Sequence, residues 1–252
     1  MPSAEHLLSL YPEGFYAHEN KKKPRPLMQL IRRIFFSSTL VRHPYFKYNG
    51  RFLDYGCGSG WRLLDFAHKG WFVLGIEPAI AAGSVSPVNH NVIGGTIFDN
   101  PSIGYYDYIL ANHSLEHDPN AFQTIPLLIK ALKAEGKLLI GVPNYNSLPA
   151  RLFRKFWWYL GAPVHTYCLT LHDLERAVDT ANARIVRTRY TGSYAGILGS
   201  LQIFVNRHSL ELASTDGFLI NNPFLMLLCQ VFAEMLNLLK IGDAIEVTIA
   251  KR

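Results

Sequence analysis

The stretch Arg51-Phe-Leu-Asp-Tyr-Gly-Cys-Gly-Ser-Gly-Trp61 joins a short apolar segment to three alternate glycines. Residues 51–55 have the composition of a buried β-strand, and Gly56, Gly58 and Gly60 follow directly. Glycine permits a positive φ and has no Cβ that would collide with a ligand lying on the backbone. The stretch therefore predicts a strand that ends in a tight turn, with a nucleotide-like group lying across that turn.

The spacing of the glycines separates the known kinds of nucleotide-binding turn. A dinucleotide fingerprint reads G-x-G-x-x-G, but here the third glycine comes one residue early and Trp61 follows it. No Gly-Lys-Ser/Thr follows either, which argues against a P-loop as well as against NAD. Glu77 ends a second apolar segment and has two acceptor oxygens, so it suits the two hydroxyls of a ribose.

Apolar segments alternate with helical patterns along the rest of the chain. Strands are predicted at 71–77, 105–112, 137–144, 184–190 and 244–252, and helices at 63–70, 125–136 and 170–183, the last with Thr170 as its N-cap. Such alternation is typical of parallel βαβ units covered on both faces. We therefore expect an α/β fold with an open, doubly wound sheet.

Two regions interrupt this alternation, and we expect them to cover the ligand site. The prediction is a single domain, 1–252, with a helical N-terminal cap at 1–48, a cofactor-binding core at 49–192, a helical insertion at 193–242 and a final strand at 243–252.

The composition excludes several classes of protein. The chain has 252 residues, of which 49% are apolar and 17% charged, and this is a globular composition rather than a disordered one. The formal net charge of +6 fits an anionic ligand or a membrane surface and selects neither. The three cysteines are widely spaced, which argues against a disulfide framework or a zinc site. We expect a cytoplasmic protein, and no set of His, Asp and Glu has convincing metal spacing.

Four motifs in chain order, "FLDYGCGSG", "VLGIEPA", "YDYILANHSLEHDPN" and "LKAEGKLLIGVPN", resemble those of class I S-adenosylmethionine-dependent methyltransferases. The resemblance covers about residues 48–192. Within the class, "LEH", "VPN" and the later "VHTYCLTLHDL" are most similar to the ubiquinone-biosynthesis O-methyltransferase-like (methyltransferase type 23-like) group, which includes many enzymes encoded with bacterial polysaccharide or lipid pathways. The resemblance implies a Rossmann-like sheet of seven mostly parallel strands, with S-adenosyl-L-methionine as cofactor and S-adenosyl-L-homocysteine as product.

The resemblance also implies roles for particular residues. Near the methionine part of the cofactor it places Asp54, Gly56, Cys57, Gly58 and Gly60; at the ribose, Glu77 with Pro78 beside it; near adenine, Thr96 and Ile97; near the transferred methyl, Asn112 and His113. The family usually has an acidic or amide residue where Thr96 and Ile97 stand. Adenine recognition is therefore expected to use backbone groups and apolar packing.

A hydroxyl acceptor must lose a proton, and histidine is the natural base near neutral pH. His113 and His117 follow the strand predicted at 105–112, and His165 lies in a later loop. Each could instead serve only local packing and hydrogen bonding. Our hypothesis is that His117 or His165 orients or deprotonates the acceptor.

Two apolar segments leave a membrane contact open. Residues 21–36 join a basic run to a short amphipathic helix, and residues 224–240 are apolar except for Gln230, Glu234, Asn237 and Lys240. A lid helix and a helix buried in the core or in a homodimer are the competing interpretations. The second segment is too short and too polar to span a bilayer.

Two functions stay in competition at this point. The first is methyl transfer to a small-molecule, glycan or lipid-linked acceptor, with a hydroxyl oxygen favoured. The second is an S-adenosylmethionine or S-adenosylhomocysteine-binding module that does not transfer. Nucleic acid is not expected as a partner, because no Asn/Asp-Pro-Pro-Tyr-type motif occurs.

Overall fold

The structure, a computed structural model, describes residues 49–80, 91–161, 165–208 and 217–252. The predicted N-terminal cap, with its basic helix, lies outside the described residues. Within the described ranges, no helix has both the length and the apolar character needed to cross a membrane.

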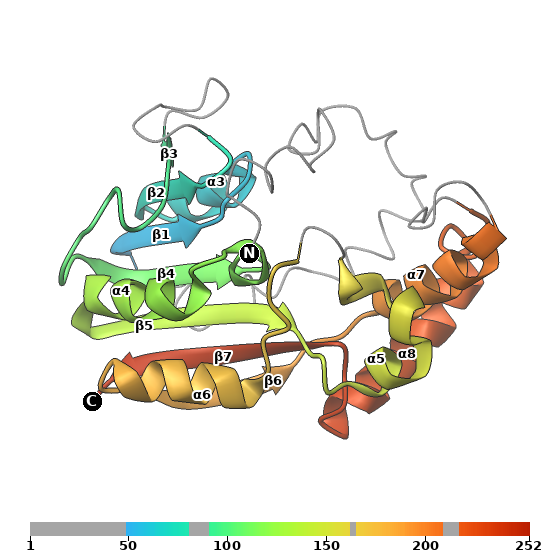
Figure 1. Cartoon of the computed structure of the whole chain (residues 1–252). Helices are drawn as coiled ribbons and strands as arrows, with labels where there is room; N and C mark the ends of the chain where they lie inside the picture. Colours follow the sequence, from blue (N-terminus) through green and yellow to red (C-terminus); the bar gives the residue numbers. More distant parts are fainter. Residues whose placement is uncertain (1–48, 81–90, 162–164, 209–216) are drawn as a thin grey trace.

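A seven-stranded sheet forms the centre of the molecule, in the order β3-β2-β1-β4-β5-β7-β6 (Figure 1). Its strands are β1 (Arg51–Tyr55), β2 (Phe72–Glu77), β3 (Val92–Gly94), β4 (Tyr106–Asn112), β5 (Leu132–Pro143), β6 (Ala183–Tyr190) and β7 (Ala244–Lys251). The pairings from β3 through β5 are parallel, and β7 is antiparallel to both β5 and β6. This confirms the predicted doubly wound α/β fold.

Helices cover both faces of this sheet. Helices α4 (Ala121–Ala131) and α6 (Leu171–Thr180) lie side by side along one face and share the larger apolar core with the inward side chains of β1, β4, β5 and β7 (Figure 1). Helix α3 (Trp61–Ala67) covers the other face, where the Phe52 and Phe66 rings stack with centroids 3.8 Å apart. Thr170 is the N-cap of α6, as predicted, and the structure adds a capping box with Asp173.

Three further helices gather beyond the carboxyl ends of the central strands (Figure 1). They are α5 (Leu148–Phe153), α7 (Tyr194–Val205) and α8 (Pro223–Leu238), the last two in the predicted insertion between β6 and β7. Buried Asp243, just before β7, ties this helical group to the sheet, because the Trp157 Nε1–H donates to its carboxylate at 2.8 Å.

The helix predicted at 125–136 is wrong in its bounds. It begins earlier, at Ala121, because Asp118 accepts a hydrogen bond from Thr124 of the first turns. It ends at Ala131, and Leu132 pairs with Tyr106 to begin β5. A Cβ at Gly136 would lie 2.8 Å from the Tyr106 carbonyl oxygen, so the strand passes β4 closely there. The short strand β3 was not predicted, because three residues give no readable alternation.

Candidate functional site

The glycine turn after β1 has the conformation that the sequence predicts. Gly56, Gly58 and Gly60 have φ of 70°, 57° and 72°. The Gly56 N–H donates to the Ile76 carbonyl at 2.8 Å, which ties the turn to the end of β2. Three left-handed residues in a row of five are accessible to glycine at little strain.

The absence of a side chain at Gly56 has a cause within the chain. A Cβ at this position would overlap the Cβ of Ser114, which follows β4. The backbone of the turn at Gly56 therefore packs directly against the side chain of Ser114. Packing of Ser114 is therefore one reason for glycine at position 56, and the predicted contact of its backbone with a ligand stays a prediction.

Asp54 is a buried carboxylate with unmet hydrogen-bonding capacity. It is 1% exposed, and neither of its oxygens has a hydrogen-bond partner among the described residues. The nearest cation is Arg62 of α3, with NH1 3.6 Å from Oδ2. Burial raises the pKa of Asp54 to about 6, and Arg62 offsets only part of this rise. Such a group fits a ligand that brings a cationic donor to the turn.

Glu77, at the end of β2, is oriented by the turn itself. Its Oε2 accepts from the Gly58 N–H at 2.6 Å, and its Oε1 accepts from the Ala79 N–H at 3.0 Å. Burial raises its pKa, and these two hydrogen bonds lower it in part. Each oxygen keeps a second lone pair, so the carboxylate can still accept from the two hydroxyls of a ribose.

The remaining cofactor candidates differ in what their side chains can do. The Cys57 thiol lies in the smaller core, where it fills the space over Gly75, so only its backbone is available to a ligand. Pro78 is exposed beside Glu77. Ile97 is packed in the larger core, and Thr96 donates through its N–H and Oγ1–H to Asp99 at 2.7 and 2.8 Å. Asp99, which was not predicted from the sequence, is the acid closest along the chain to Thr96 and Ile97, the positions expected near adenine.

Asn112 ends β4, and His113 follows it, next to the Ser114 that packs on Gly56. The absence of a side chain at Gly141 gives room to Asn112, whose Oδ1 would lie 2.5 Å from a Cβ there. His113 has a φ of 53°, its ring stacks on Tyr159, and its Nδ1 lies 3.1 Å from the Glu116 Oε1. The geometry therefore makes His113 a partner of Glu116.

Glu116 is the centre of the histidine group. It is 1% exposed, and its Oε2 has no hydrogen-bond partner among the described residues. Burial alone would raise its pKa, but the bond from His113 and the nearby imidazoles of His117 and His165 outweigh burial and lower it. A buried carboxylate beside three imidazoles stabilises positive charge on any of them.

His165 is brought to this group from 48 residues away in sequence, counted from His117. The His117 and His165 ring centroids are 4.6 Å apart. The N–H groups of Thr166 and Tyr167 both donate to the Glu116 carbonyl, at 2.7 and 3.2 Å, and this fixes the loop. Gly161 has a φ of 58° and leaves room for the His165 ring, which would overlap any Cβ at that position.

The hydrogen bond of His165 assigns its tautomer. Its Nδ1 lies 3.0 Å from the Tyr159 carbonyl oxygen, which can only accept, so Nδ1 carries the proton and Nε2 keeps a lone pair. Burial lowers the pKa of His165 to about 4. The ring is therefore neutral throughout the neutral range, and its Nε2 offers a lone pair of reduced basicity.

The same residues change one expectation from the sequence. The spacing suggested no metal-ligand set, but the fold brings ligand atoms of Glu116, His117 and His165 within 4.8 Å of one another. Three such atoms could hold a divalent ion. The set was not visible in the sequence because His165 arrives from a distant loop.

Glu246 of β7 is a further buried acid that the sequence reasoning missed. It is 6% exposed, it pairs with Gly141, and its Cγ lies beside the space over Gly141 into which Asn112 projects. Burial raises its pKa, and Arg189, whose NH1 is 3.7 Å from Oε2, offsets part of the rise. Glu246 is the one acid in the apolar strand "AIEVTIA", and this exception to the pattern could have marked it as a candidate site residue.

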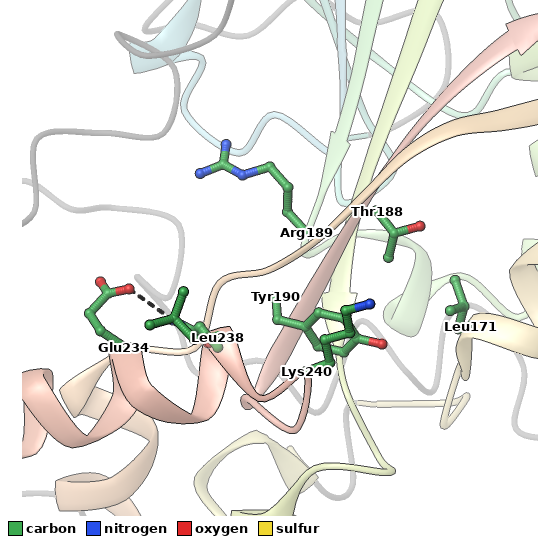
Figure 2. Close-up of a pocket in the computed structure, with 8 residues that line it drawn as sticks. Leu171, Thr188, Arg189, Tyr190, Glu234, Leu238 and Lys240 are labelled. Atoms are coloured by element: carbon green, nitrogen blue, oxygen red, sulfur yellow. Dashed lines mark hydrogen bonds between the residues drawn. The ribbon is translucent and has the colours of Figure 1, made fainter.

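A cavity of about 540 Å³ lies apart from this site, between β6 and the end of α8. Figure 2 shows Arg189 on the β6 side and Glu234 and Leu238 on the α8 side. β6 is the edge strand, separated from β1 by three strands, so the cavity does not belong to the glycine turn.

Comparison with known proteins agrees with this fold. Residues 16–188 match the model of a family described as a methyltransferase domain. No curated protein matches the sequence. A SAM dependent methyltransferase from Archaeoglobus fulgidus is similar in structure, with a TM-score of 0.55, 22% identity, and coverage of 89% of this chain and 99% of that one.

Two other solved structures are similar at lower identity. The cyclopropane synthase MmaA2 from Mycobacterium tuberculosis has a TM-score of 0.56 and 16% identity, over 99% of each chain. A possible histamine N-methyltransferase from Thermotoga maritima has a TM-score of 0.52 and 16% identity, over 88% of this chain and 92% of that one. At these identities the likeness concerns the fold. The match to the family model spans more than half of the chain, and the chain therefore belongs to the methyltransferase domain family, in the S-adenosylmethionine-dependent class I that its motifs resemble.

Proposed function

We propose that this chain transfers a methyl group from S-adenosylmethionine to a hydroxyl oxygen of a small-molecule, glycan or lipid-linked acceptor. The observation that carries the proposal is the pairing of two sites at the carboxyl ends of neighbouring strands. One is the glycine turn, with the buried Asp54 that lacks a hydrogen bond in the described residues and with the oriented Glu77; the other is the buried Glu116 with its histidines.

The residues of the turn fit the cofactor. Asp54 would receive the amino group of its methionine part, because a buried carboxylate without donors gains most from a cation. Glu77 would hold the ribose hydroxyls with the lone pairs left over from Gly58 and Ala79. When bound, the cofactor supplies a methyl group on a positively charged sulfur, and the acceptor oxygen displaces the thioether.

His165 is the base that the geometry favours. Its Nε2 accepts the acceptor's proton as the new oxygen–carbon bond forms, while Nδ1 stays bonded to the Tyr159 carbonyl. The resulting imidazolium is stabilised by Glu116, whose carboxylate lies among the three histidines. His117, next to His165, is the second candidate, and His113 positions Glu116.

The test is transfer of label from methyl-tritiated S-adenosylmethionine to a panel of free sugars, catechols and lipid-linked sugars. The proposal predicts that label enters one hydroxyl-bearing class, and that His165→Gln lowers the rate by roughly 10²-fold or more while cofactor affinity stays unchanged. Label that enters only an amine or a carbon acceptor would contradict oxygen transfer. Tight cofactor binding with no transfer to any acceptor of the panel would favour the function of a binding module that does not transfer.

A further inference from the structure

Helix α8 is amphipathic with its polar side directed inward. Gln230 is 6% exposed, and its Oε1 accepts from the Tyr194 N–H at 3.0 Å. Asn237 exchanges two hydrogen bonds of 2.8 Å with the backbone of Gly192. Glu234 accepts from the Gln230 side chain at 2.8 Å. Gln230 and Asn237 thus attach α8 to the protein beside the buried Met226, Ala233 and Leu236, whereas Glu234 is exposed and bonds to side chains of its own helix.

The outward side of α8 is apolar and exposed. Val231 is 65% exposed, Leu228 58% and Leu238 84%, and these residues recur at the three- and four-residue spacing that lines one face of a helix. We call this set the α8 apolar face: Phe224, Leu227, Leu228, Val231, Phe232, Met235, Leu238 and Leu239. Core burial, one of the interpretations open from the sequence, holds for the opposite side of the helix and is wrong for this one. Exposed apolar surface on this scale marks an interaction site.

The same helical group exposes further apolar side chains. Leu148 and Leu152 of α5 are exposed, as are Phe204 and Val205 of α7. Both helices lie in the group that α8 joins beyond the sheet (Figure 1). The apolar surface is therefore a property of the group and is not confined to one helix.

The charges of this group, in its described ranges, are mainly basic. In residues 148–160, 194–208 and 217–240, the exposed basic residues are Arg151, Arg154, Lys155, Arg207 and Lys240. The acid in these ranges is Glu234, which is engaged by Gln230 and Asn237. Arg207 and Lys155 lie over the rings of Phe204 and Phe156, at 4.5 and 5.1 Å, so cationic groups border apolar ones.

We propose that the α8 apolar face lies flat on an anionic phospholipid surface, with these basic residues contacting the head groups. An exposed apolar side of α8, with Lys240 just after the helix and four more exposed basic residues in the same helical group, has the composition of an interfacial surface, and 16 residues is an ordinary length for such a helix. A second copy is the less suitable occupant. A two-fold interface brings a patch against its own copy, and a helical group with five exposed cations and one acid offers few opposite charges for pairing. This inference concerns docking and does not depend on the proposed acceptor.

Flotation of the full chain with vesicles tests the proposal. Phosphatidylcholine vesicles with and without 30% phosphatidylglycerol would be compared at roughly 50 and 500 mM NaCl. We expect binding to the anionic vesicles at low salt and at least tenfold weaker binding at high salt or to neutral vesicles. Leu228→Gln/Val231→Gln should weaken binding tenfold or more, and Lys155→Ala/Lys240→Ala roughly tenfold.

The matched control is Leu64→Gln/Ile103→Gln, which changes two exposed apolar residues on other parts of the fold and should leave binding unchanged. Calorimetry with S-adenosylmethionine shows whether each variant keeps its fold. The proposal is overturned by absence of vesicle binding at low salt, or by equal binding to neutral vesicles. It is also overturned if sedimentation shows a dimer that the Leu228/Val231 variant abolishes while vesicles bind neither protein.

Discussion

Asp54→Asn is expected to weaken cofactor binding without weakening the fold. The carboxylate is buried, it has no hydrogen-bond partner among the described residues beyond its 3.6 Å ion pair with Arg62, and burial raises its pKa from 3.8 to about 6. Two pKa units correspond to roughly 3 kcal/mol that the ionised group costs the unliganded protein at neutral pH. A bound ammonium group would relieve this cost, so the variant should lose up to roughly 100-fold in affinity at pH 7.5.

The pH dependence gives the prediction its sign. Below pH 6 the wild-type carboxyl is protonated before ligand binds, so the dissociation constant should rise about tenfold for each unit that the pH falls. In Asp54→Asn, which has no carboxyl group at this position, the dissociation constant should not change with pH over this range. A carboxyl group whose pKa is raised in the folded state lowers the unfolding free energy as the pH rises from its ordinary pKa to about 6. The unliganded Asp54→Asn variant should therefore be no less stable than wild type at pH 7.5.

Isothermal calorimetry at pH 5, 6, 7 and 8 makes the measurement, with S-adenosylhomocysteine as a second ligand that keeps the amino group. The control is Asp65→Asn, an exposed acid on the same helix as Arg62, which should bind like wild type. Equal affinities of Asp54→Asn and wild type across this range would refute the role given to Asp54.

Three further predictions concern the histidine group and the turn. Between pH 6.5 and 4, wild type should lose roughly 3 kcal/mol more unfolding free energy than His165→Gln. A histidine whose pKa is lowered in the folded state stabilises the fold above its ordinary pKa, and this contribution is lost as the pH falls. Urea titration at each pH checks this, and parallel curves would contradict it. Gly56→Ala should lower the unfolding free energy by roughly 2–4 kcal/mol through its φ of 70° and the overlap with Ser114, and adding Ser114→Gly should restore part of the loss; equal stability of the single and double variants would show that Ser114 is not the cause. If the Glu116–His117–His165 group moves protons, dialysis against EDTA should leave turnover unchanged, whereas a loss that Zn²⁺ or Mg²⁺ restores would assign the group to a metal ion.

The fold could be predicted from the sequence because local pattern and global arrangement agree. The apolar strands, the glycine turn and the N-cap at Thr170 are each set by neighbouring residues, and each was predicted. The boundary between α4 and β5 was wrong because residues 132–136 suit a helix locally, and pairing of Leu132 with Tyr106 overrides that preference. β3 was missed because three residues carry too little pattern.

In the site, too, the features set by residues close in sequence were predicted, and those set by distant contacts were not. The acid ending β2 and the turn after β1 are close in sequence and were predicted together. The contact of His165 with Glu116, the packing of Ser114 on Gly56 and the approach of Glu246 to Asn112 depend on pairings across many residues, which periodicity does not encode. The exposure of the α8 apolar face was missed for a related reason: an apolar helix normally turns that face to the core, and here Gln230 and Asn237 hold the opposite side.

The most direct test is a crystal structure of the chain with S-adenosylhomocysteine. The account predicts the ligand's amino group within hydrogen-bonding distance of Asp54, its ribose hydroxyls on the Glu77 carboxylate, and its sulfur facing the side of the site that holds His165. A turn left empty at saturating ligand, or a ligand bound elsewhere such as the cavity beside β6, would contradict it.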